Sequence, residues 1–254
     1  EYLEPFTAYV KKHPEVEVIY YDQLGSYFSD QPNDPSLWTI DRFLREIEEV
    51  RKAWHLDQFY LYGQSWGGTL ALEYAASAYG RHLKGLIDSN MVDNYADYAK
   101  YINKYRETMD PADVKYMKEI EAKGNFDDHH YNELLGKLYQ RCICRLKPWP
   151  DAVKRTFEHL NEQVYVTLQG PTEFTITGSL KNWNIRDRLK NIKIPALVLG
   201  GKYDSMNPEE IKALAKRLPN GQAHICPNGS HFSIFDDQKD YFSAISKFIN
   251  EVEK

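Results

Sequence analysis

The sequence has few cysteines, no excess of basic residues and no long hydrophobic run. Its 254 residues include only 3 cysteines, which make no disulfide framework and favour a reducing compartment. Lys and Arg number 32 against 37 Asp and Glu, and the net charge of -5 argues against a nucleic-acid-binding protein. No apolar stretch approaches the ~18 residues that a membrane span requires, so we do not expect the chain to be an integral membrane protein.

Repeats and low-complexity tracts are also absent, and the remaining composition is that of an ordinary globular protein. Hydrophobic residues make up 42% and charged residues 27% of a chain whose length suits one large domain, or a core with a sizeable insertion. Tyrosine is unusually frequent, with 19 residues, more than a core needs. This excess predicts a tyrosine-lined cavity or interface.

Strand-like and helix-like segments alternate in the first third of the chain. β-rich runs predict strands at 16–21, 58–62 and 83–88. Apolar residues at helical spacing predict a helix over 39–54, and a second helix is expected to end at Ala76. This alternation is typical of an α/β protein with a mostly parallel sheet and helices on both faces.

The middle of the chain lacks strand signals and is predicted to be helical. Helices are expected over 111–123, with Asp110 as N-cap, and over 130–145 and 151–160. The alternation then resumes, with strands at 194–200 and 222–226 and helices at 208–218 and 239–252. We therefore expect an α/β core, residues 1–90 and 182–254, interrupted by an all-helical cap (lid), residues 91–181.

A nucleophile motif lies between a predicted strand and a predicted helix. Residues 63–67 read GQSWG and match G-x-S-x-G. In this setting the serine lies on a strained turn at a helix N-terminus, where the helix dipole favours developing negative charge. So short a pattern can occur by chance, but the strand–turn–helix setting and the following Gly68 make Ser65 a candidate nucleophile.

A serine nucleophile requires a base and an orienting carboxylate, which in α/β hydrolases follow in the order Ser, Asp, His. Asp204 follows the predicted strand at 194–200, and His231 follows the strand at 222–226. Loops at the carboxyl ends of parallel strands form the sites of such sheets. We therefore predict a Ser65–Asp204–His231 triad.

The other histidines have structural or solvated interpretations. His55, His82 and His159 lie in or beside predicted helices. His129 and His130 follow two aspartates and suggest a metal site, but no third ligand is recognisable, so a solvated helix start is favoured. We expect no metal and no cofactor.

Several motifs together resemble those of the proline iminopeptidases, proline-specific serine peptidases of the α/β-hydrolase fold, over essentially the whole chain. Besides GQSWGG at 63–68, they are YDQ at 21–23, RLKPWP at 145–150 and GPTEFTITG at 170–178. The last two are far more specific than the nucleophile motif. The resemblance implies an α/β-hydrolase fold and the release of an N-terminal residue, typically proline, from a short peptide.

The resemblance also implies roles for individual residues. Ser65 attacks the carbonyl carbon, His231 transfers the proton, and Asp204 orients and stabilises the imidazolium. The backbone N–H of Trp66 is one oxyanion donor. Glu173 binds the free α-ammonium of the substrate, which a carboxylate in a partly desolvated aromatic pocket can do. Without the resemblance, Glu173 is more simply a surface or capping carboxylate.

Two positions depart from the family pattern. The family commonly has a second Glu directly after the catalytic Asp, whereas Ser205 stands here. The loss of this charge puts tight recognition of the amine in doubt and favours an amide or ester specificity. The family usually has Gly at the position of Tyr27, which either crowds the pocket or replaces a water.

Alternatives to an aminopeptidase stay open at this point. An amino-acid amidase, an esterase or a lactonase would use the same triad, whereas a non-catalytic receptor or scaffold predicts a broken one. Epoxide hydrolases and dehalogenases require a carboxylate at the position of Ser65. The expected partner is a small peptide or amino-acid amide substrate, with no nucleic acid and no membrane. The cytoplasm is expected from the lack of a visible signal, although a missing amino terminus would hide one.

The chain begins with EYLEPF, without an initiator Met. In the family, a strand ending in a His-Gly-Gly-Pro-Gly loop precedes the helix that residues 1–6 resemble, and this loop supplies the second oxyanion donor. We therefore expect an upstream N-terminal segment. It would complete the oxyanion hole and fill the sheet between the predicted strands at 16–21 and 58–62.

Overall fold

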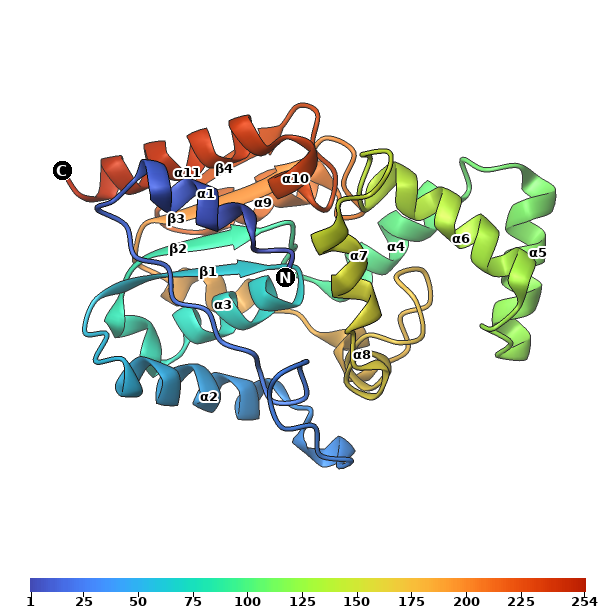
Figure 1. Ribbon diagram of the computed structural model, residues 1–254, viewed down its shortest axis with the longest axis horizontal. Helices are drawn as coiled ribbons and strands as arrows, with labels where there is room; N and C mark the ends of the chain where they lie inside the picture. The colour runs from blue at the N-terminus through green and yellow to red at the C-terminus, as the bar shows by residue number, and fades with distance from the viewer.

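Four strands form one parallel sheet in the computed structural model, which describes residues 1–254 (Figure 1). Their spatial order is β1-β2-β3-β4. The inner strands β2 and β3 are buried almost throughout, whereas the edge strands β1 and β4 are partly exposed, which follows from a parallel sheet covered on both faces. The bounds are β1 Phe59–Gln64, β2 Leu83–Ser89, β3 Ala196–Gly201 and β4 Gly221–Cys226.

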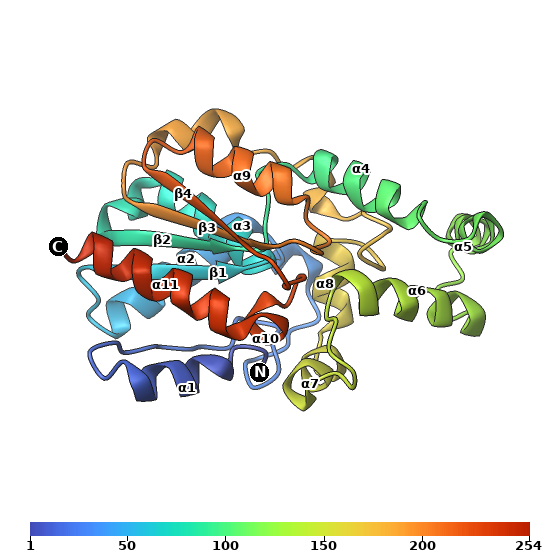
Figure 2. The same cartoon turned by 90° about the horizontal axis from the view of Figure 1, so that it is seen from above.

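Helices cover both faces of this sheet, as Figure 2 shows from above. Three helices pack on one face: α2 (Ile40–Ala53), α3 (Trp66–Ala76) and α9 (Pro208–Arg217). Two pack on the other, α1 (Pro5–Lys12) and α11 (Gln238–Val252), and the short α10 (Ser233–Asp236) precedes α11. Each face therefore buries its own apolar cluster, which fixes the sheet as the centre of the core.

Five helices lie between β2 and β3 in the chain, beyond the carboxyl ends of the strands (Figure 1). The second-longest of them, α5, has the predicted bounds because Asp110 caps its N-terminus and Gly124 ends it at a φ of 66°. No helix of the chain is both long enough and apolar enough to cross a lipid bilayer. The five helices are α4 Tyr95–Arg106, α5 Pro111–Lys123, α6 His129–Cys142, α7 Asp151–Glu158 and α8 Glu162–Leu168.

The prediction of a strand at residues 16–21 is wrong. This segment belongs to no strand, and it lies across a cavity of about 1280 Å³ from β1, which lines the same cavity. A β-rich sequence forms a strand only where another strand lies within hydrogen-bonding distance, and the cavity separates the two segments here. Nine of the 19 tyrosines line this cavity, as the excess of tyrosine predicted.

Candidate active site

Ser65 lies on the turn that joins β1 to α3. Its backbone has φ 55° and ψ -120°, a strained conformation for a residue with a side chain. The neighbouring glycines make the turn possible, because a Cβ on Gly63 would lie 2.0 Å from the carbonyl oxygen of Gly67. The strain lifts the serine above the sheet at the N-terminus of α3, as the G-x-S-x-G motif predicts.

Asp204 and His231 are hydrogen-bonded to each other. His231 Nδ1 lies 2.9 Å from Asp204 Oδ1, and both side chains are buried. The same carboxylate oxygen accepts the backbone N–H of Met206 at 3.0 Å, which fixes its orientation. The two loops that follow β3 and β4 therefore bring these side chains together, although 27 residues separate them in the chain.

Ser65 and His231 line the same cavity, without a hydrogen bond between them. The backbone next to Ser65 is nevertheless fixed to the histidine loop, because Gln64 Nε2 donates to the carbonyl oxygen of His231 at 3.0 Å. Hydrogen bonds between catalytic groups are often long in substrate-free enzymes and shorten in the substrate complex.

The pKa of His231 is raised above its ordinary value by its surroundings. Burial lowers the pKa, but the negative charge of Asp204 and its hydrogen bond raise it, and the charge of Glu173 adds to this effect. The raising contributions outweigh the burial. The imidazole can therefore accept a proton readily and hold it as an imidazolium.

Glu173 lies in the same cavity, and tyrosines from the inserted helices surround it. Tyr165 on α8 donates to its Oε1 at 2.5 Å, and Tyr98 on α4 donates to its Oε2. Burial, followed by the charge of Glu173, raises the pKa of both hydroxyls, so they stay protonated donors. The carboxylate forms no ion pair with a Lys or Arg side chain of the chain, which leaves its negative charge available to a cationic ligand.

Trp66 is the first residue of α3, so its backbone N–H lies in the first turn, where amide groups have no partner inside the helix. Its indole Nε1 donates to Gln23 Oε1 at 3.2 Å. Gln23, the last residue of the YDQ motif, therefore lies against the residue that follows the nucleophile. This contact joins the early loop to the helix N-terminus.

Sequence reasoning missed Asn90, which follows β2. Its side-chain amide is buried and donates to Asp204 Oδ2 at 2.6 Å and to the carbonyl oxygen of Ser230 at 3.1 Å. The only sequence signal for Asn90 was its position just after the carboxyl end of the strand predicted at 83–88, where site residues of parallel sheets gather. The pairing itself is a long-range contact that no local pattern encodes.

His129 and His130 lie at the exposed start of α6, where Asp128 caps the helix and Glu133 pairs with both imidazoles. This is the solvated helix start that the sequence favoured. The two histidines are not part of any group of three potential metal ligands.

Comparison with known proteins identifies the family. Residues 8–238 match the family model of the alpha/beta hydrolase fold. The chain is 44% identical to a proline iminopeptidase of Flavobacterium johnsoniae over 256 residues, which cover 99% of this chain and 86% of that protein. The chain belongs to the proline iminopeptidase family. It is therefore a hydrolase of the α/β-hydrolase fold, as its motifs predicted.

Two solved structures agree with the fold of the chain. A crystal structure of the proline iminopeptidase of Mycobacterium smegmatis superposes with a TM-score of 0.87 at 25% identity, and covers 98% of this chain and 85% of that one. The crystal structure of VinJ superposes with a TM-score of 0.93 at 26% identity, and covers 99% of this chain and 86% of that one.

Ser205 and Tyr27, the two positions that depart from the family pattern, have different surroundings in the structure. The buried Ser205 hydroxyl is 3.4 Å from Asp204 Oδ1, and Ser205 does not line the cavity. Tyr27 does line it, and its ring stacks on His159 with the ring centroids 3.7 Å apart and the planes at 8°. Tyr27 therefore fills space at the wall of the cavity, next to the inserted helices.

Proposed function

We propose that the protein is a serine aminopeptidase that releases an N-terminal proline, or another small residue, from short peptides. One observation supports this best: Glu173, a carboxylate without a cationic partner, shares a cavity with Ser65 and His231. A peptide with a free amino terminus would place its ammonium on Glu173 and its first carbonyl carbon near Ser65. The names of the relatives point to the same reaction.

In this proposal His231 removes the proton of the Ser65 hydroxyl as the oxygen attacks the carbonyl carbon. The Trp66 N–H stabilises the oxyanion, and Asp204 stabilises the imidazolium. His231 then donates the proton to the leaving amine, and a water molecule, activated by the same imidazole, hydrolyses the acyl-enzyme. Residues 91–181 act as the cap that supplies Glu173 and limits the length of the substrate.

A comparison of substrates tests the free-amine requirement. Turnover of a prolyl arylamide is compared with that of an N-blocked prolyl arylamide and a short acyl ester, for the wild type and for Ser65→Ala. We expect the free amine to be strongly preferred and Ser65→Ala to be inactive on all three. Equal turnover of the blocked and free arylamides would contradict an aminopeptidase.

Glu173→Gln tests the ammonium site directly. Because a hydrogen bond to a charged group is worth about 1.5–3 kcal/mol, KM for free-amine substrates should rise about 10–100-fold while ester turnover barely changes. Glu162→Gln is the matched control, since Glu162 is an exposed carboxylate on a nearby helix. Equal effects of Glu173→Gln on amine and ester substrates would exclude the role.

An amino-acid amidase is the second candidate, because Ser205 supplies no second carboxylate for the ammonium. An amidase predicts that a prolyl amide is hydrolysed faster than a prolyl dipeptide. Labelling of Ser65 by a fluorophosphonate would exclude the remaining alternative, a scaffold without catalytic activity. The cytoplasm is the proposed compartment, and the three free, buried cysteines agree with it.

A further inference from the structure

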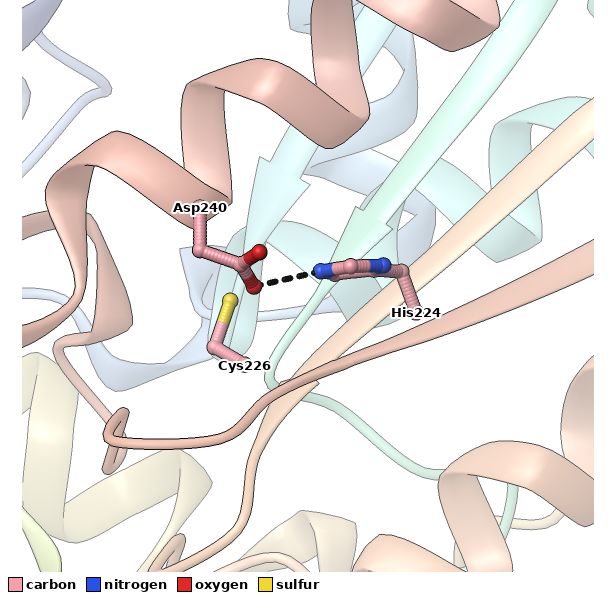
Figure 3. A group of neighbouring side chains, drawn as sticks. All are labelled: His224, Cys226 and Asp240. Carbon is pink, nitrogen blue, oxygen red and sulfur yellow. Dashed lines mark hydrogen bonds and ion pairs between the residues drawn. The ribbon is translucent and has the colours of Figure 1, made fainter.

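His224, Cys226 and Asp240 bring an imidazole, a thiol and a carboxylate together, away from the candidate active site (Figure 3). His224 and Cys226 are two residues apart on β4, so their side chains lie on the same face of the strand. Asp240 lies in the first turn of α11, which packs on this face. One potential ligand atom from each residue lies within 4.8 Å of the other two.

The cluster combines these three donors with an excess of negative charge. The carboxylates of Asp240 and Asp237 lie close enough to the buried Cys226 sulfur for their negative charges to act on it. His224, whose Nε2 is 2.6 Å from Asp240 Oδ2, is the one basic side chain paired with Asp240. A cation at this point would offset the carboxylate charges next to the buried sulfur.

We propose that His224, Cys226 and Asp240 bind a zinc ion. An imidazole nitrogen, a thiolate and a carboxylate oxygen are ligands that Zn²⁺ accepts in tetrahedral sites, with a water in the fourth position. Tetrahedral bonds of about 2.0–2.3 Å place the ligand atoms roughly 3.3–3.7 Å apart. The present separations bracket this range, because His224 Nε2 and Asp240 Oδ2 are 2.6 Å apart and no pair of ligand atoms is more than 4.8 Å apart. On binding, the Cys226 thiol loses its proton to solvent and the sulfur bonds to the metal.

The site is open to an incoming ion from solvent. The side chain of His224 is 35% exposed and that of Asp240 is 36% exposed, whereas Cys226 is fully buried beneath them. An ion can therefore meet the imidazole and the carboxylate first and reach the sulfur last. Zinc would replace the direct contact between His224 and Asp240.

Zinc at this place would join the two ends of the segment that contains His231. Cys226 is the last residue of β4, and Asp240 lies at the start of α11, so the loop with His231 and the short α10 lie between two of the ligands. A bound ion would close this segment into a loop held at both ends. We therefore expect zinc to raise the thermal stability of the protein.

Calorimetric titration of the metal-free protein with Zn²⁺ tests the site, together with titration by Co²⁺ followed by absorption. We expect one ion per chain, a rise in Tm with zinc, and a sulfur-to-cobalt charge-transfer band. His224→Gln and Asp240→Asn should each weaken zinc binding by at least ~10-fold, and Cys226→Ser should abolish the charge-transfer band. His224 is partly exposed, so its variant is expected to fold even if Cys226→Ser does not.

Three further variants separate this site from other metal-binding groups. His129→Gln removes an exposed histidine, Cys144→Ser removes another buried thiol, and His231→Ala removes the imidazole of the candidate active site. All three should retain the zinc affinity and the charge-transfer band of the wild type. No binding by the wild type, or an unchanged affinity in His224→Gln, would overturn the proposal.

Discussion

Asn90 donates a hydrogen bond of 2.6 Å to Asp204 Oδ2, while the other carboxylate oxygen, Oδ1, is 2.9 Å from His231 Nδ1. Both oxygens of the carboxylate therefore have partners from different loops. Asn90 itself has a φ of 53°, in the left-handed region that asparagine adopts more readily than most residues. Its amide fixes the plane of the carboxylate that faces the imidazole.

Replacement of Asn90 by Gly should lower kcat/KM about 10-fold or more. Glycine keeps the left-handed backbone but removes the amide, and a hydrogen bond to a charged group is worth about 1.5–3 kcal/mol. The pKa of His231 should rise as well, because the carboxylate loses a donor that stabilises its charge. Steady-state kinetics as a function of pH measure both effects. Asn132→Gly, at an exposed site on α6, is the control that should leave kinetics unchanged.

The pH dependence of activity follows from the raised pKa of His231. Since the neutral imidazole is the base, kcat/KM should increase with pH, with a midpoint above the ordinary value of 6.5. Asp204→Asn removes the charge that raises the pKa, so the midpoint should fall and kcat should drop about 10³–10⁴-fold. A midpoint that does not move in Asp204→Asn would contradict this electrostatic account.

The same shift makes a prediction for stability. Because the folded pKa of His231 lies above the unfolded value of about 6.5, its contribution is fully present below that pH. The contribution is lost as the pH rises through the folded pKa. Denaturant unfolding should therefore show that wild type, unlike His231→Gln, loses this contribution as the pH rises above about 6.5 and passes through the folded pKa.

The tyrosines around Glu173 should affect substrate binding rather than the chemical step. Tyr165→Phe removes one of the two hydroxyls that orient the carboxylate, so KM for free-amine substrates should rise about 10-fold with kcat little changed. Turnover of an N-blocked ester serves as the internal reference. Tyr116→Phe, which removes a hydroxyl bound to Asp128 at the far side of the inserted helices, should change neither parameter.

Gly63→Ala should prevent the nucleophile turn from forming. The added Cβ would lie 2.0 Å from the Gly67 carbonyl oxygen, which requires the backbone to move. We expect a loss of more than 3 kcal/mol in the free energy of unfolding, about the size of a severe core change, measured by denaturant titration. Gly67→Ala is the matched control, because a Cβ there meets nothing within 4 Å, and its stability should stay close to that of the wild type.

Local signals predicted the elements whose ends are encoded locally. The bounds of α5 follow from Asp110, Pro111 and Gly124, and the strands β2 and β3 follow from buried β-rich runs between loop residues. The nucleophile motif, the order in the chain and the positions after predicted strands together selected Ser65, Asp204 and His231. The structure pairs Asp204 with His231 and lines one cavity with Ser65 and His231. Each of these features depends on the chemistry of a short segment.

Features that depend on a distant partner were not predictable in this way. Residues 16–21 have the composition of a strand, but whether they pair is decided by what lies beside them. Asn90 reaches Asp204 across 114 positions of the chain. Asp240 joins His224 and Cys226 only because α11 packs on β4. No local sequence pattern encodes either contact.

The backbone N–H groups of His231 and Phe232 donate to the carbonyl oxygens of Cys142 and Ile143, at 2.9 and 2.8 Å, at the end of α6. The inserted helices are therefore joined to the histidine loop by main-chain hydrogen bonds. These bonds do not depend on the identity of the side chains at either end. Excision of residues 91–181, or their exchange for the insertion of another hydrolase, would release the imidazole as well as remove Glu173. Engineering of specificity in this protein has to leave residues 142 and 143 in place and work on the far ends of the inserted helices.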